Sequence, residues 1–136
     1  MWINNIPSIV FTKMKLYTNA ILTERYQSKY SGLNFTANTI SKGEPKFPTV
    51  LFRKLQGQES GSDLDGEDVN AVISSIQIDV TTITSQTDAQ NIADAVMEAM
   101  KKMRYRIVGD MFSDNDATKY RIVMRFNRLI GHDDII

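Results

Sequence analysis

The only histidine of the sequence, His132, stands beside two carboxylates near the end of the chain. An imidazole next to Asp133 and Asp134 has the residue types that general acid–base catalysis uses, because the pKa of histidine lies close to neutral pH. These residues belong to the segment GHDDII, which we expect to form a frayed tail over 131–136. A fraying terminus does not hold catalytic groups in place, so we expect no catalysis at His132.

A run of carboxylates in the segment DLDGED offers the oxygen ligands that calcium and magnesium prefer. The spacing does not fit an EF-hand loop. With Asp63 and Asp65 as the third and fifth ligands, the first position falls on Gly61 and the twelfth, which should be glutamate, falls on Val72. We therefore expect no bound metal and interpret the segment as a solvated or partner-facing loop. Its candidate contact residues are Asp63, Asp65, Glu67 and Asp68.

Other common chemistries lack candidate residues. The chain has no cysteine, which excludes thiolate nucleophiles, disulfides and zinc–thiolate sites. Neither a GxGxxG nor a GxxxxGK motif occurs, and the many serines and threonines have no evident base partner. We expect no cofactor and no enzymatic activity. A small metal-dependent enzyme that uses Asp63 and Asp65 is the weakest of the alternatives.

Five arginines fall in the last third of the chain, where neighbouring strands would bring their side chains together. They would suit the phosphates of a nucleic acid or, equally, the acidic segment of a second copy. Tyr105, Tyr120 and Phe126 interleave with them, but strand alternation directs these rings to the opposite face, toward a core rather than toward bases. The candidate subunit-interface face consists of Arg104, Arg106, Arg121, Arg125 and Arg128.

Two helices are needed to position these residues. Asn4 or Asn5 as a cap, Pro7 in the first turn and apolar spacings of three and four predict a helix over 6–30, ended by Ser31-Gly32. Thr87 and Gln90 predict a capping box for a second helix that runs to about Met103. The stripe of this helix is predicted to be core: Ala89, Ile92, Ala93, Val96, Met100 and Met103.

Four strands are predicted over 47–55, 72–83, 105–112 and 119–130, and the last two are joined by the turn SDNDAT. The first is apolar on both faces and is expected to be covered twice. Residues 33–45 are expected to be loop with short extended pieces, 56–70 to be a long mobile loop, and Gly109 to mark a bulge or close contact. The order α-β-β-α-β-β predicts an α+β fold: one domain over 1–136, with two helices on one face of a four-stranded, mostly antiparallel sheet.

The composition suits such a domain, because 136 residues, 42% of them hydrophobic, can bury a core without disulfides or a metal. The formal net charge is zero, but the charges are segregated. Residues 1–56 carry eight basic and two acidic side chains, 57–100 carry nine acidic and no Lys or Arg, and 101–136 carry eight basic and five acidic. Signed patches of this kind favour contacts between copies. With no leader-like or membrane-length apolar segment, we expect a soluble, intracellular protein.

The order of elements resembles one family. The chain is similar to the tail-terminator, or tail-to-head joining, proteins of long-tailed bacteriophages. The likeness lies in the order of a long N-terminal helix, the strand FPTVLFRKL, a polar loop, the strand VISSIQIDVTT, the capped helix TDAQNIADAVMEAMKKM and the final hairpin of YRIVGDMF with KYRIVMRFNRLI. Head-completion and minor capsid proteins of the same fold are the nearest alternatives, and a nucleic-acid-binding module that uses the arginine face is a more distant one.

The resemblance implies a non-enzymatic virion protein that is assembled in the host cytoplasm and located in the tail. It would cap the tail tube, end the polymerisation of the tube and meet the head connector, as a ring of six copies around a channel through which DNA only passes. The loop 58–70 would face the lumen or the tube, where its acids would repel passing DNA. Arg121 and Arg125 would lie at or near subunit contacts.

Overall fold

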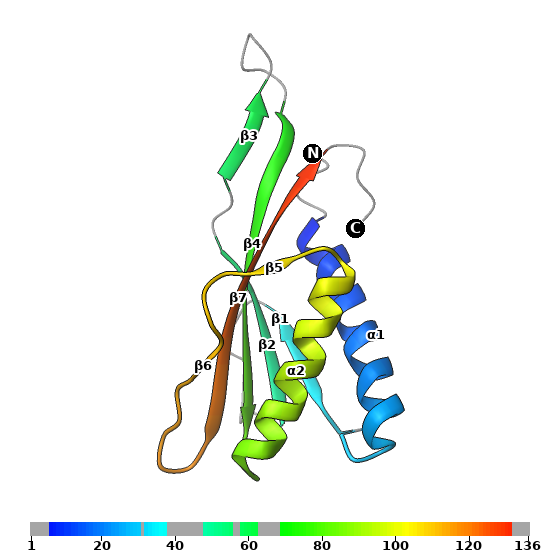
Figure 1. Cartoon of the computed structure of the whole chain (residues 1–136), viewed down its shortest axis with the longest axis vertical. Coiled ribbons are helices and arrows are strands. Elements are labelled where there is room, and N and C mark those ends of the chain that lie inside the picture. The colour runs from blue at the N-terminus through cyan, green and yellow to red at the C-terminus, as the bar shows by residue number, and fades with distance from the viewer. Residues whose placement is uncertain (1–5, 31, 38–47, 56–57, 63–68, 132–136) are drawn as a thin grey trace.

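A computed structural model of the chain describes residues 6–30, 32–37, 48–55, 58–62 and 69–131 (Figure 1). It has two helices and one mixed sheet, so the predicted α+β class is confirmed. None of the helices in the described ranges is long and apolar enough to cross a membrane. The elements are α1 (Ile6–Tyr26), β1 (Asn34–Ala37), β2 (Thr49–Lys54), β3 (Gln58–Ser62), β4 (Val69–Thr82), α2 (Gln86–Lys102), β5 (Arg106–Ile107), β6 (Phe112–Ser113) and β7 (Tyr120–Gly131).

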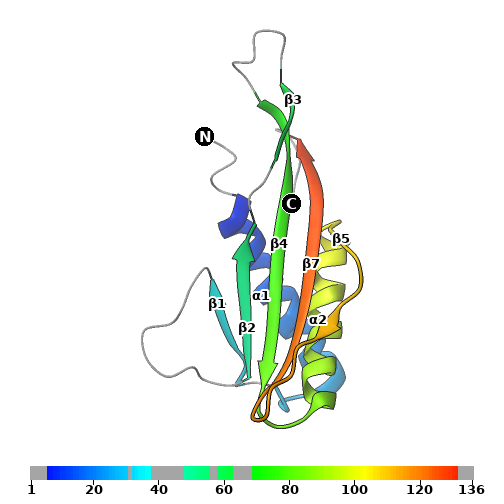
Figure 2. The same cartoon turned by 90° about the vertical axis from the view of Figure 1, so that its left-hand side faces the viewer.

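Over the described residues the sheet has seven strands rather than the predicted four, in the order β1-β2-β4-β7-β5, with β3 on β4 and β6 on β7. β1 pairs with β2 in parallel, and every other pairing is antiparallel. The added strands are short or irregular segments that show no sustained period in the sequence. Both helices lie on the same side of the sheet (Figures 1 and 2), as their packing against each other and of α2 against β4 and β7 also indicates.

The core lies between the helices and the sheet face that they cover. Strand alternation supplies one wall, because every second residue of a strand points to the same side. The residues that β4 and β7 contribute to this core are Ile76, Ile78, Val80, Ile122, Met124, Phe126 and Ile130. All six residues of the stripe predicted for α2 are buried, and α1 contributes Val10, Met14 and Ile21.

Helix α1 ends at Tyr26, four residues before the predicted end. Gln27 follows with φ at +56°, the left-handed conformation that ends many helices, and its N–H still donates to Thr23 O at 3.0 Å. The chain then turns through Tyr30, whose side chain is buried. Glycine is usual in a left-handed position, so a glutamine there left no stop signal in the sequence.

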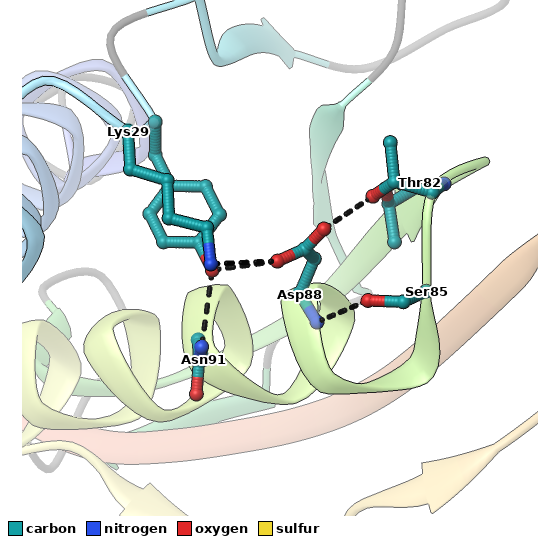
Figure 3. A network of polar contacts seen from close by, with 7 residues as sticks. Lys29, Thr82, Ser85, Asp88 and Asn91 are labelled. Carbon is teal, nitrogen blue, oxygen red and sulfur yellow. Dashed lines mark hydrogen bonds and ion pairs between the residues drawn. The ribbon is translucent and has the colours of Figure 1, made fainter.

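The N-cap of α2 lies two residues before the predicted one, so Thr87 and Gln90 both lie inside the helix. Ser85 is the N-cap: its Oγ accepts a hydrogen bond from the N–H of Asp88 at 3.1 Å. The Asp88 carboxylate in turn accepts from the Tyr30 hydroxyl at 2.8 Å, and Asn91 donates to that hydroxyl at 3.0 Å (Figure 3). A cap of α2 therefore also fixes the segment that follows α1.

A β-arm replaces part of the loop predicted over 56–70. Gln58–Ser62 form β3, which pairs with the start of β4 from Gln58↔Ile73 to Ser62↔Val69. β3 and the first part of β4 extend past the ends of both helices (Figure 1). The polar composition of the segment argued against order, but a hairpin satisfies the backbone through its neighbour without burying apolar side chains.

Two other strands differ from their predicted form. The predicted strand 105–112 is split into β5 and β6 by Gly109, which has φ at +70°. β2 is shorter than predicted, and its two faces differ: Val50 is buried, whereas Leu51 on the opposite face is only half-buried. Among the described residues, both helices cover the Val50 side, and the double covering expected for this strand stays a prediction.

Candidate functional site

The sheet face opposite the helices, which we call the outer face, carries charged and amide side chains. Pairing between β4 and β7 sets its rows: Asp79 lies opposite Val123, and Gln77 lies opposite Arg125. β2 adds Arg53 opposite Gln77. These residues alternate with the core residues of the same strands, so the pattern that builds the core also places the polar groups on the outer face.

Asp79 is the centre of this face. Asp79 is only 2% exposed. Its carboxylate accepts hydrogen bonds from Arg121 Nη2 at 2.6 Å and from Gln77 Nε2 at 3.1 Å, and forms a longer ion pair with Arg53 Nη2 at 3.8 Å. Both arginines are diagonal neighbours of Asp79 across the strand pairs. Burial of a carboxylate is costly unless it is paired, and here two guanidinium groups and an amide supply the pairing.

Arg121 joins this centre to the final hairpin. Its Nη1 also binds Asp114 Oδ2 at 2.8 Å. The hydrogen bond with Asp79 is the main reason that the pKa of Arg121 is raised, and Asp114 adds to the effect. Arg121 therefore stays charged and ties the turn after β6 to the middle of the sheet.

Arg125 extends the polar row toward the other end of β7. Its Nε donates to Gln77 Oε1 at 3.1 Å, and the Gln77 amide donates in turn to Asp79. The guanidinium remains exposed beyond that contact. Leu129, four residues further along the same face of β7, is 58% exposed. The outer face thus combines fixed charges with accessible apolar area, a mixture common in protein contact surfaces.

The five arginines of the predicted interface face do not share one face. Arg121 and Arg125 lie on the outer face, and Arg106 pairs with Asn127 of the same face. Arg128 has the opposite strand parity and lies on the helix side: it is 7% exposed, and its Nη1 donates to Met103 O at 3.0 Å, beyond the end of α2. The parity of position 128 relative to 121 and 125 was a signal in the sequence for this separation.

A cleft nevertheless brings three of these arginines together where β5 leaves β7. Its volume is about 420 Å³. It is lined by Arg104, which follows α2 with φ at +64°, together with Arg106 and Arg128. The remaining lining residues are Ile73, Asn127 and Leu129. Three of the six described residues that line the cleft are therefore arginines, and none of the six is acidic.

The acidic candidates cannot be placed in the same way. Asp63, Asp65, Glu67 and Asp68 lie outside the described residues, in the segment between the paired ends Ser62 of β3 and Val69 of β4. His132 with Asp133 and Asp134 also lies outside them. Within the described ranges, no group of three His, Cys, Asp or Glu side chains is arranged to hold a metal ion.

Sequence reasoning missed the role of Asp79. It was assigned to the polar side of its strand, but not paired with any arginine. The available signal was its type and parity: it is the one acid in an otherwise uncharged strand, and it lies on the same side as Arg121 and Arg125 of the last strand. Neither a scan against protein-family models nor a search of curated proteins finds a match to this sequence.

Proposed function

We propose that the protein is a non-enzymatic structural protein of a virion, a tail terminator that caps the tail tube of a long-tailed phage, ends its polymerisation and meets the head connector. It would act as a ring of copies, with six as the expected number. The phage assignment rests on the resemblance of the element order. What the structure adds in support is a set of surfaces suited to assembly.

The observation that carries the proposal is the outer face together with the β-arm. Among the described elements, both helices cover one side of the sheet, and the outer face presents Arg125 and Leu129 to solvent. The arm of β3 and β4 reaches beyond the body (Figure 1). A strand pair that projects from a domain and a sheet face without a helix layer are both regular sites of contact between subunits.

A structural role also agrees with the state of the polar groups. Asp79 and Arg121 are paired within the chain, so they stiffen the outer face rather than offer free acid or base to a substrate. Rigid, charged faces favour specific contact between copies, because complementary potentials select register and orientation. The remaining positive groups, including Arg125, would lie at or near subunit contacts.

The test compares assembly of the wild type with that of an outer-face variant. Light scattering over a range of concentrations and negative-stain microscopy, with and without purified tail tubes, should reveal rings of the wild type. Arg125→Glu should reduce ring formation, whereas Lys15→Glu, an equal charge change at an exposed position of α1, should not. A wild type that stays monomeric at high concentration and forms no ring on tail tubes would overturn the proposal.

Two alternatives have distinct outcomes. A head-completion or minor capsid protein of the same fold would bind to heads and leave tail tubes uncapped. A nucleic-acid-binding module is favoured by Arg106, Arg121 and Arg125 sharing one face, although the last two already have partners within the chain. For that module, the affinity for duplex DNA should fall steeply as salt rises. An affinity that is insensitive to salt rejects phosphate contacts.

A further inference from the structure

The sheet edge formed by residues 108–112, VGDMF, which we call the β5–β6 edge, exposes two apolar side chains. The N–H of Val108 donates to Arg125 O at 2.7 Å, and Phe112 lies opposite Val123. Positions 123 and 125 share the outer face, so Val108 and Phe112 lie side by side on it. They are 48% and 50% exposed, and apolar side chains grouped in this way mark a contact with another molecule.

An acid lies between these two apolar residues in the chain. Residues 109–111 oppose only Met124 of β7, because Gly109, with φ at +70°, lets the edge bulge out of the ladder. Asp110 lies in this bulge, is exposed and forms no ion pair with any residue that the structure describes. The β5–β6 edge thus offers a carboxylate flanked by apolar side chains.

The outer face carries a row of opposite charge. Arg53, Gln77 and Arg125 lie opposite one another across β2, β4 and β7, which run side by side (Figure 2). The two arginines are exposed, and their backbones are about 10 Å apart at 4.8 Å per strand. Arg53 lies 3.8 Å from Asp79, and Arg125 donates to Gln77 through Nε. A guanidinium has five N–H donors, so both keep the capacity to bind a further carboxylate.

Aliphatic side chains flank this row on the same face. The parity of β2 and β7 places them there, and the Leu55 N–H extends the pairing of β2 by donating to Ser75 O at 2.8 Å. The flanking side chains are Leu51, Leu55 and Leu129. A row of cations with aliphatic flanks complements an acid with apolar flanks, so the outer face and the β5–β6 edge match in both charge and hydrophobicity.

The β5–β6 edge does not reach the far end of this row within its own chain. The strand order β2-β4-β7-β5 puts three strand intervals, about 14 Å, between this edge and Arg53. The backbone bond from Val108 to Arg125 holds the edge beside β7. The β2 side of the outer face therefore meets a β5–β6 edge only when a second copy supplies it.

We infer that the β5–β6 edge of one copy docks on the outer face of a second copy, with Asp110 between Arg53 and Arg125 and the two apolar side chains against the flanking leucines. The inference rests on the proposed function in taking the partner to be another copy. Edge and face are different surfaces, so each copy gives its edge to one neighbour and receives the edge of the other. A heterologous contact of this kind closes into a ring when its rotation permits.

The test exchanges the charges of the two surfaces. The edge variant is Asp110→Arg, and the face variant is Arg53→Glu with Arg125→Glu. Sedimentation velocity over a range of concentrations should show each variant alone to associate roughly tenfold or more weakly than the wild type, because like charges then meet. An equimolar mixture of the two variants should regain association, because each new charge then faces an opposite one.

Matched controls separate this contact from a general effect of charge. Glu24→Arg makes the same charge change as the edge variant, and Lys15→Glu with Lys101→Glu makes the same change as the face variant. All three control positions are exposed on the helices, so both controls should associate like the wild type. The edge variant lies in an exposed bulge, so its comparison with Glu24→Arg carries the test even if the face variant unfolds.

The apolar part of the contact has its own pair of variants. Phe112→Ser should weaken association, because it removes apolar area from the contact. Ile83→Ser, which removes a similarly exposed apolar side chain after the end of β4, should not.

Two results would overturn the inference: an Asp110→Arg protein that associates as strongly as the wild type, or a mixture that associates no more strongly than either variant alone. If Asp110→Arg still forms rings on tail tubes, the terminator role stands and this contact is rejected. Recovery on mixing, in a protein whose wild type never caps tail tubes, would retain the contact and reject the terminator role.

Discussion

Replacement of Asp79 by asparagine tests whether the centre of the outer face is held by charge. Asparagine keeps the shape of the side chain and one oxygen that can accept from Gln77, but it removes the negative charge that faces Arg121 at 2.6 Å and Arg53 at 3.8 Å. We expect Asp79→Asn to destabilise the fold, because Arg121 loses its shorter partner and keeps only Asp114.

The magnitude follows from the burial of the two partners. A hydrogen bond to a charged group contributes about 1.5–3 kcal/mol to stability. The Asp79 side chain is 3% exposed, but that of Arg121 is 33% exposed, so water can replace part of the lost interaction. We therefore expect a loss of about 1–2 kcal/mol in the free energy of unfolding. For a chain of this length that corresponds to a fall of roughly 3–8 °C in Tm.

Urea and thermal unfolding of both proteins measure this change, with Asp114→Asn as the matched control. Asp114 binds the same guanidinium, but its side chain is 58% exposed, so its loss should cost less than about 0.5 kcal/mol. A double-mutant cycle with Arg121→Gln isolates the pairwise term. Equal effects of Asp79→Asn and Asp114→Asn, or an Asp79→Asn variant as stable as the wild type, would refute the reasoning and show that desolvation offsets the attraction.

Three further predictions concern the helices. Thr18 is fully buried in α1, and its Oγ1 has no hydrogen-bond partner among the described residues. Thr18→Val should therefore raise the unfolding free energy by about 1 kcal/mol in urea titrations. The control Thr12→Val, at an exposed position of the same helix, should change it little. Gln27→Gly should stabilise the protein by about 0.5–1 kcal/mol, since glycine adopts a positive φ without strain; a lower Tm would contradict this. Hydrogen bonds, first from Thr84 and then from Tyr30, lower the pKa of Asp88 in the folded protein. The stabilisation that the Asp88 carboxylate gives is therefore present above its unfolded pKa of about 4 and is lost as the pH falls through its folded pKa. The difference in unfolding free energy between the wild type and Asp88→Asn should be full at pH 7 and shrink on acidification below about pH 4.

Several parts of the fold were predictable from local patterns. The alternation of Ile76, Ile78 and Val80 and the stripe of α2 define faces without any knowledge of their partners, because side-chain direction follows from the period of the backbone. These predictions were confirmed. The polar side of the last strand, with Arg121 and Arg125, followed from the same rule.

The ends and partners of elements were less predictable. α1 ends at Tyr26, just before the left-handed Gln27, and α2 begins after its N-cap Ser85, so one backbone conformation and one side-chain hydrogen bond decide these two boundaries. The β-arm and the parallel pairing of β1 depend on which strand is available beside them, which no window of the sequence contains. Sequence reasoning therefore mistook β3 for part of a loop, expected only short extended pieces where β1 lies, and predicted β5 and β6 as one strand.

By itself, the sequence determined the fold class, the faces of the two longest strands, the core stripe of α2 and the segregation of charge, since each depends on residue types at fixed local spacings. Only the tertiary structure decided that Asp79 joins Arg121, that Arg128 lies beneath the end of α2, and that Arg104 and Arg106 meet it in one cleft. These contacts join residues far apart in the chain, so they arise from strand register and helix docking rather than from any local period.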